Sequence, residues 1–202
     1  MLKLLKWIND KPHEGIHQTM GYRLCRRGFL KAGMVALGGC ILPKDLLGAV
    51  QDPQKPERSL SLYNLHTGEA LKTAYWFKGE YLSEALSEIN HILRDFRTGE
   101  IKPIDTDLLD LLHTIHDTLG SQEMLYIISG YRSPATNAYL HEYSCGVASH
   151  SLHVQGKAAD IRLPGCSLST LRQAAVSLKR GGVGYYPGSD FIHVDVGRVR
   201  YW

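Results

Sequence analysis

The stretch Gly181-Gly-Val-Gly-Tyr-Tyr-Pro-Gly-Ser-Asp-Phe-Ile-His-Val-Asp-Val196 predicts a β-hairpin near the end of the 202-residue chain. Two short runs rich in β-branched and aromatic residues flank Pro187-Gly-Ser-Asp190, whose composition is typical of a turn. Side chains alternate between the two faces of a strand, so the aliphatic residues of the second run would face the core. The residues on its other face are Phe191, His193 and Asp195. Polar groups gathered on one face of a hairpin strand indicate a site built on a sheet.

Outward from this hairpin, the hydrophobic pattern alternates between hairpins and helices in an irregular order. Further strands are expected at 60–65, 71–76, 124–128 and 157–163, and helices at 80–97, 106–119, 134–143 and 168–179. A strict strand–helix–strand repeat would indicate a parallel α/β sheet, and this order does not follow one. The sequence therefore predicts an α+β domain with a small mixed or antiparallel sheet and flanking helices.

Charge is distributed unevenly along the chain. Residues 1–49 contain eight Lys/Arg and three Asp/Glu, a net charge of +5, whereas the remainder contains 15 basic and 17 acidic residues, a net charge of −2. A nucleic-acid-binding domain usually carries a basic surface, and the near-neutral body of this chain offers none. We therefore expect no nucleic-acid partner.

The basic N-terminal segment has the pattern of an export signal. Arg26-Arg-Gly-Phe-Leu-Lys31 precedes the apolar run Ala32–Leu42, which is too short to span a bilayer. The arginine pair resembles a twin-arginine signal, and Gly48-Ala49 offers a cleavage point. The expected organisation is a leader over 1–49, a Pro-bearing linker over 50–58 and one domain over 59–202. Such a leader implies the twin-arginine export machinery as a partner, location in the periplasm or cell envelope, and no transmembrane segment after its removal.

Two features of the cysteines and the start site leave alternatives open. Leu37-Gly-Gly-Cys40 resembles a lipoprotein box, which would give a lipid anchor at Cys40, and Met20 could replace Met1 as the true start. Beyond the leader only Cys145 and Cys166 remain, and in an oxidising compartment they could form a disulfide or stay as two buried thiols.

His153, Asp160 and His193 form a candidate metal-ligand set. Gly156 lies between the first two and gives their loop freedom to turn back, so both side chains could reach one ion. Mixed nitrogen and oxygen ligands suit zinc better than magnesium or calcium. Three protein ligands with a fourth position open to water are typical of catalytic zinc.

The motif Ser151-x-His153-x-x-Gly156-x-Ala158-x-Asp160, followed by a histidine on a C-terminal strand, resembles the peptidoglycan zinc peptidases. These include D-Ala-D-Ala carboxypeptidases and lysostaphin-like enzymes. The chain is most similar to the murein endopeptidase K (YcbK-like) group. The shared stretches are 65–69, 129–133, 153–160 and 181–187. The resemblance implies a Hedgehog/D-Ala-D-Ala-peptidase-like fold for the domain at 59–202.

The resemblance also implies roles for individual residues. His153, Asp160 and His193 would bind Zn²⁺, and an aspartate would take a proton from the attacking water. Asp190, three residues before the last ligand, is the position that the wider family favours, but its strand parity is that of the core-facing residues. Asp195 has the parity of His193 and could instead orient it. Arg132 follows a strand end, where it could bind a substrate carboxylate or a developing oxyanion.

The function expected from the resemblance is therefore zinc-dependent hydrolysis of peptidoglycan cross-link or stem peptides, including L,D bonds between diaminopimelate residues. The alternative is a non-catalytic, zinc-containing module that binds the cell wall.

Overall fold

The computed structural model describes residues 57–143, 148 and 150–202. The leader expected at 1–49, most of the linker, Cys40 and Cys145 lie outside these residues. Within the part that is described, no helix is both long and apolar enough to cross a membrane.

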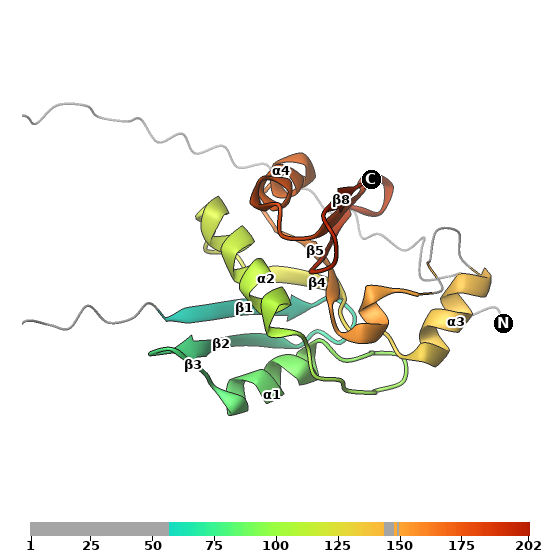
Figure 1. Ribbon diagram of the computed structural model, residues 1–202, viewed down its shortest axis with the longest axis horizontal. Helices are drawn as coiled ribbons and strands as arrows, with labels where there is room; N and C mark the ends of the chain where they lie inside the picture. The colour runs from blue at the N-terminus through green and yellow to red at the C-terminus, as the bar shows by residue number, and fades with distance from the viewer. Residues whose placement is uncertain (1–56, 144–147, 149) are drawn as a thin grey trace, which may run out of the picture. The chain divides into compact units, whose positions relative to one another are not determined.

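The described chain forms eight strands, four α-helices and two short 3-10 turns (Figure 1). The strands are β1 (Arg58–Asn64), β2 (Ala70–Phe77), β3 (Glu80–Tyr81), β4 (Leu125–Ser129), β5 (Ala158–Arg162), β6 (Gly182–Tyr186), β7 (Phe191–Asp195) and β8 (Arg200–Tyr201). The helices are α1 (Ser83–Ile92), α2 (Thr106–Leu119), α3 (Pro134–Tyr143) and α4 (Leu168–Leu178), with 3-10 turns η3 (Leu152–Gln155) and η4 (Pro187–Ser189).

All eight strands belong to one mixed sheet in the order β3-β2-β1-β4-β5-β7-β6-β8. The β1–β4 and β6–β8 pairs are parallel, and the other five pairs are antiparallel. The predicted α+β class, with a mixed sheet and flanking helices, is confirmed. The C-terminal hairpin of β6 and β7 lies beside β5 and so brings the two segments of the candidate metal set next to each other.

The helix expected at 80–97 is shorter than its hydrophobic pattern suggested. Lys78 and Gly79 both have positive φ and turn the chain, so that β3 pairs with the end of β2 before the helix begins. Beyond α1, the Asp95 carboxylate accepts hydrogen bonds from the backbone of Arg97 and Ser133. The apolar residues after Ile92 therefore belong to a loop that Asp95 ties to the segment after β4.

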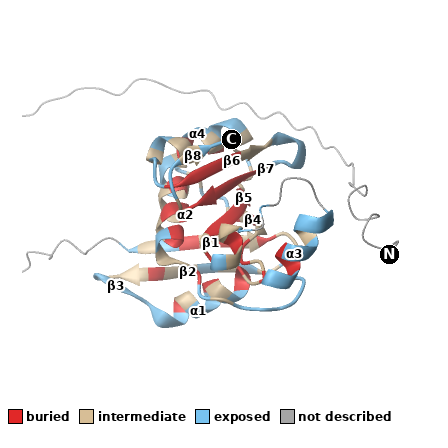
Figure 2. Cartoon of the chain, turned by 45° about the vertical axis from the view of Figure 1, so that its right-hand side comes forward, coloured by how far each residue is buried: buried red, intermediate tan, exposed pale blue. Residues whose placement is uncertain are grey.

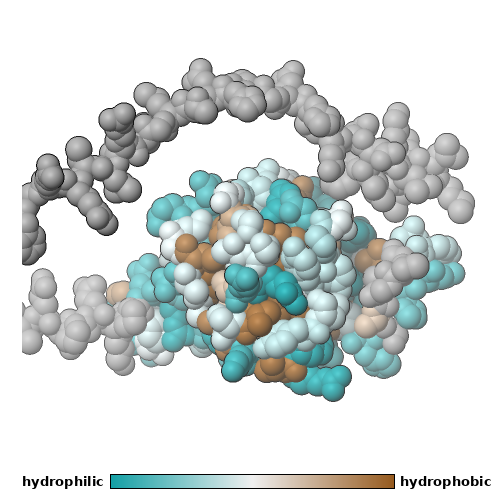
Figure 3. Space-filling view, turned by 90° about the horizontal axis from the view of Figure 1, so that it is seen from above, coloured by the Kyte–Doolittle hydropathy of each residue, from teal (hydrophilic) through white to brown (hydrophobic). Residues whose placement is uncertain are grey.

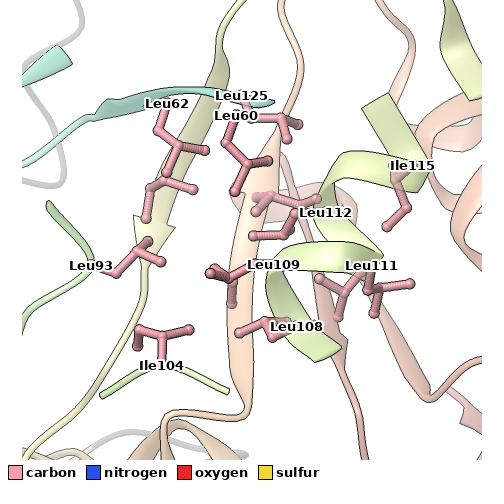
Figure 4. Packing of buried hydrophobic residues seen from close by; sticks show 14 of the residues in the cluster. Leu60, Leu62, Leu93, Ile104, Leu108, Leu109, Leu111, Leu112, Ile115 and Leu125 are labelled. Atoms are coloured by element: carbon pink, nitrogen blue, oxygen red, sulfur yellow. The ribbon is translucent and has the colours of Figure 1, made fainter. Parts of the chain in front are cut away.

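The core lies between the sheet and helices α1, α2 and α4. Helix α2 begins at Asp105, whose carboxylate accepts from the Asp107 backbone, and ends at Gly120, a left-handed residue. Figure 4 shows the leucines of α2 packed against strand residues such as Leu60, Leu62 and Leu125. Each fully buried side chain of this size contributes about 1.5–3 kcal/mol to folding, so this cluster is the main source of stability.

The turn between β1 and β2 contains the shared stretch at 65–69. The Asn64 side chain accepts from the backbone N–H groups of His66 and Thr67. Glu69 pairs with Arg94 at 2.7 Å, which ties this turn to the loop after α1. These contacts give the stretch a structural role.

The sheet has one covered face and one partly open face. The buried segments gather in the central strands, whereas much of the helix surface is exposed (Figure 2). Side chains that share a face with Asp160 and His193 are half-buried further along the strands, as at Tyr126 and Arg162. On the face seen in Figure 3, from the side of α4, hydrophobic surface occurs as separate patches between hydrophilic ones.

Candidate active site

The short turn η3 positions His153. Ser151 caps this turn by accepting from the His153 backbone N–H, and Gly156 ends it at φ +70°. A Cβ at Gly156 would lie 2.6 Å from the Pro103 carbonyl oxygen, so both the backbone angle and the close packing require glycine. The sequence expectation that Gly156 turns the chain back toward the sheet matches this geometry.

Asp160 and His193 come from neighbouring strands. They are directly paired in the antiparallel β5–β7 ladder, so their side chains project from the same face of the sheet. The Asp160 Oδ1 atom lies 2.9 Å from His193 Nδ1 and 3.3 Å from His153 Nε2, and the two histidine nitrogens are 3.1 Å apart. Tetrahedral ligands of a zinc ion bonded at 2.0–2.1 Å lie about 3.3 Å from each other, so these three atoms have zinc-ligand spacing.

The outer nitrogens of both histidines have acceptors. His153 Nδ1 lies 2.7 Å from the Gly130 carbonyl oxygen, and His193 Nε2 lies 2.9 Å from Asp195 Oδ2. If these nitrogens carry the ring protons, each neutral ring presents the lone pair of its facing nitrogen, as a metal-bound histidine does. Two lone pairs 3.1 Å apart repel unless a cation or proton lies between them. The donor set therefore fits a metal ion such as zinc.

Asp195 is held firmly behind His193. It is fully buried and accepts hydrogen bonds from the backbone of Gly182 and Gly197 and from both terminal nitrogens of Arg200. A metal-bound histidine commonly donates its other N–H to such a carboxylate, which fixes the ring orientation. This contact corresponds to the orienting role that sequence parity left open for Asp195.

Burial and hydrogen bonds act in opposite directions on the pKa values of this cluster. Burial alone would raise the pKa of Asp160, but its electrostatic interactions and hydrogen bonds with His153 and His193 outweigh burial and lower the pKa. The pKa of Asp195 is also lowered, because donors from His193 and Arg200 outweigh burial. For His193, contacts with both aspartates outweigh burial and raise the pKa. Both carboxylates are therefore ionised at neutral pH.

Arg132 reaches the same cluster from the end of β4. Its position depends on Gly130, where a Cβ would lie 2.5 Å from the Leu93 carbonyl oxygen. One terminal nitrogen is 3.8 Å from Asp160 Oδ2, and the other hydrogen bonds of the guanidinium, to Ser129 and Asn137, are 3.4 and 3.5 Å long. Its buried Nε has no hydrogen-bond partner among the described residues. A buried guanidinium with such weak contacts can accept a stronger anionic partner.

A cavity of about 320 Å³ opens over this cluster. Its walls include the three candidate ligands, Arg132 and several residues of the C-terminal hairpin and β8. The lining residues are Arg132, Ala148, His150, Ser151, Leu152, His153, Asp160, Tyr186, Ser189, Phe191, His193, Arg200 and Trp202. We call the three candidate ligands His153, Asp160 and His193 the metal-ligand triangle, and the cavity gives a substrate access to one side of it.

The structure does not bring Asp190 to the metal-ligand triangle. Its carboxylate is 2.6 Å from Arg162 Nη1, its side chain is 61% exposed, and it does not line the cavity. Asp190 itself has a left-handed backbone at the start of β7. Its two neighbours, Ser189 and Phe191, do line the cavity. Asp190 therefore lies at the rim, with its charge paired away from the cluster.

Arg200 and Trp202 are site residues that the sequence analysis missed. Trp202 packs over Gly184, where a Cβ would lie 2.7 Å from the indole, and its ring centre is 5.4 Å from that of His193. Strand β8 has only two residues, which is too short for a periodic pattern. In the sequence, these residues stand out only as a charged residue followed by two aromatic ones, Arg200-Tyr-Trp202.

The comparisons with known proteins agree with this geometry. The family model for peptidoglycan L,D-endopeptidase MepK matches residues 52–202. The peptidoglycan L,D-endopeptidase MepK of Escherichia coli K12 is 44% identical over 177 residues, which cover 88% of this chain and 96% of the relative. The probable peptidoglycan L,D-endopeptidase MepK of Haemophilus influenzae is 40% identical over 178 residues, covering 88% of this chain and 95% of the relative. With His153, Asp160 and His193 of its motif folded into one candidate metal site, the chain belongs to the MepK family of M15 peptidases.

Proposed function

We propose that this protein is a zinc-dependent endopeptidase that hydrolyses L,D peptide cross-links in peptidoglycan. The observation that carries the proposal is the triangle of His153 Nε2, Asp160 Oδ1 and His193 Nδ1, with separations of 2.9–3.3 Å and both rings fixed by acceptors behind them. The names of the relatives supply the substrate class.

The three ligands would leave one coordination position facing the cavity. Zinc bound there supplies Lewis acidity, which lowers the pKa of a water molecule and polarises a peptide carbonyl. His153, Asp160 and His193 would hold the ion, and Asp195 would keep the His193 ring in the tautomer that exposes Nδ1. Arg132 binds negative charge of the substrate beside Asp160, where its weakly bonded guanidinium is available.

Hydrolysis is tested with purified muropeptide dimers joined by an L,D bond. We expect the zinc-loaded protein to release monomers, and a chelator followed by zinc to abolish and restore that release. An Asp160→Asn variant serves as the matched control, because it removes the anionic ligand and preserves the side-chain volume. A protein that binds stoichiometric zinc and cell wall without releasing product is a binding module, and that result would overturn the proposal.

We further propose that the N-terminal segment exports the folded domain to the periplasm through the twin-arginine route. The support is the sequence Arg26-Arg-Gly-Phe-Leu-Lys31 before an apolar run. Replacing both arginines by lysine should retain the protein in the cytoplasm, as measured by cell fractionation. Unchanged export of that variant would contradict the twin-arginine route.

A further inference from the structure

A row of side chains crosses the partly open face of the sheet, two residues along the strands from the Asp160–His193 pair. On β5 and β7 the Asp160–His193 pair is followed, two residues along, by Arg162 and Phe191 on the same face. The ladders extend this row to both sides through Tyr126–Arg162, Tyr63–Tyr126 and Tyr186–Phe191. We call the five residues the aromatic row: Tyr63, Tyr126, Arg162, Phe191 and Tyr186.

The members of the aromatic row contact one another and stay partly exposed. The ring centres of Tyr63 and Tyr126 are 5.2 Å apart, and the rings of Tyr186 and Phe191 stack at 4.7 Å. The Arg162 guanidinium lies 5.5 Å above the Tyr126 ring. All five residues are of intermediate burial, whereas the neighbours of opposite parity, such as Ile161 and Ile192, are fully buried in the core. The row is therefore an accessible surface that continues from the cavity.

Arg162 and Asp190 place two opposite charges side by side in the middle of this row. Arg162 Nη1 donates to Asp190 Oδ2 at 2.6 Å, and the two side chains are 35% and 61% exposed. The contact leaves other guanidinium N–H groups and the second carboxylate oxygen accessible for a ligand. A group that carries both a carboxylate and an ammonium on one carbon matches this pair charge for charge.

The distance to the metal-ligand pair limits what that group is. Two residues of a strand separate Arg162 from Asp160, which corresponds to about 7 Å. A diamino-dicarboxylic acid such as diaminopimelate carries its free head group on a chain of four carbon–carbon bonds, which extends over about 5 Å. With a scissile carbonyl over the triangle, the side chain of the same residue is therefore long enough to bring its head group near Arg162.

We propose that the Arg162–Asp190 pair binds the free amino-acid head group of the diaminopimelate residue whose carbonyl is cleaved. Arg162 binds the head-group carboxylate, Asp190 binds its ammonium, and Tyr126 and Phe191 cover the aliphatic chain. This inference rests on the proposed function, because it assumes that the scissile bond lies over the metal-ligand triangle. It assigns Asp190 a role in substrate recognition in place of proton transfer.

The test compares substrates that differ only at the head group. L,D-linked dimers are prepared with the free head group, with its carboxylate amidated and with its amine acetylated. For Arg162→Gln we expect KM for the free dimer to rise at least about tenfold with kcat retained, and little change for the amidated dimer. For Asp190→Asn we expect the same rise for the free dimer and little change for the acetylated dimer.

Arg94→Gln is the matched control, because Arg94 forms a similar 2.7 Å pair with Glu69 and neither residue lines the cavity. It should leave KM for all three dimers unchanged. Equal losses on all dimers for Arg162→Gln, or an unchanged KM for the free dimer, would overturn the proposal. A collapse of kcat in Asp190→Asn would instead assign Asp190 to the chemical step and would also overturn it.

A binding measurement separates this proposal from the proposed function. Calorimetry with a diaminopimelate-ending tripeptide should show binding to the zinc-loaded wild type and at least about tenfold weaker binding to Arg162→Gln. If the wild type cleaves no dimer but shows this Arg162-dependent binding, the proposed hydrolysis is wrong and the head-group site stands. Equal binding to both proteins, or no binding to either, refutes the head-group site whatever the activity.

Discussion

His153 Nε2 and His193 Nδ1 face each other across 3.1 Å, while the remaining nitrogen of each ring is bonded to an acceptor. The sequence separates these histidines by 40 residues, and the fold brings them together because η3 packs beside the β5–β7 ladder. The lone pairs of the two facing nitrogens would repel each other, and a bound cation would remove this repulsion. Metal binding and stability of the domain are therefore expected to be coupled.

Removing a ligand should abolish tight metal binding. His153→Ala and Asp160→Asn are expected to lose stoichiometric zinc, since the first removes a nitrogen of the triangle and the second replaces its anionic carboxylate with a neutral amide. Elemental analysis of purified protein measures the zinc content, and thermal unfolding with added zinc measures the coupling. We expect zinc to raise the Tm of the wild type and to leave that of both variants unchanged. Stoichiometric zinc in both variants would show that the ion binds elsewhere.

Asp195 should increase the zinc affinity of the site by fixing the orientation of the His193 ring. Asp195→Asn removes the charge that fixes the ring, so zinc affinity should fall about 10- to 100-fold. Competition with a chelator of known affinity measures this change. Arg200→Gln is the companion variant, because Arg200 donates two hydrogen bonds to Asp195. It is expected to produce a smaller loss in the same direction. An unchanged affinity in Asp195→Asn would refute the orienting role.

Arg132 should contribute to turnover without holding the metal. Arg132→Ala is expected to lower kcat/KM about 100-fold or more, the range for loss of a charge-stabilising donor, while zinc content stays stoichiometric. Steady-state kinetics on L,D-linked dimers gives the first quantity. Arg132→Lys restores the charge but not the planar group, so only partial recovery is expected. If Arg132→Ala keeps wild-type turnover, its guanidinium serves structure alone.

Asp110 of α2 should stabilise the packing of this helix against β1, β2 and β3, away from the candidate site. Its carboxylate accepts from Arg58, Tyr75 and Tyr81, and these bonds outweigh burial and lower its pKa. Because the folded pKa lies below the unfolded one, this stabilisation is present above about pH 4 and is lost as the pH falls through the folded pKa. Asp110→Asn should cost about 2 kcal/mol at pH 7.

Urea unfolding at pH 7 and pH 3 measures the free energy of unfolding of Asp110→Asn and wild type. We expect the difference between the two proteins to shrink at the lower pH, because unfolded wild type binds a proton at Asp110 there more readily than folded wild type, whose Asp110 pKa is lower. A difference that grows toward pH 3 would contradict the sign of the pKa shift.

Several helices and strands of the fold could be predicted from the local sequence pattern. The helix predicted over 106–119 has these bounds in α2, where Asp105 caps the start and Gly120 ends the helix in a left-handed conformation. The β6–β7 hairpin followed from the turn at Pro187–Asp190. The end of α1 was not predictable from periodicity, because Leu93 is buried in a loop that Asp95 organises through long-range hydrogen bonds.

Some residues of the candidate site were likewise predictable from the sequence, and others were not. The identities of the candidate ligands came from motif spacing, and their alternation on β7 correctly put His193 and Asp195 on one face. The alternation of side chains along the strand also indicated that Asp190 would not face the same way as His193. In the structure Asp190 pairs with Arg162. The contribution of Arg200 and Trp202 depends on the parallel pairing of β8 with β6, a tertiary contact without local signal.

Zinc-dependent hydrolysis is tested by the rate at which zinc-loaded protein cleaves an L,D-linked muropeptide dimer, compared with the same protein after removal of metal. We expect multiple turnovers with zinc, none after chelation, and recovery when zinc is returned. Equal cleavage with and without metal, or stoichiometric zinc with no cleavage at all, would contradict it.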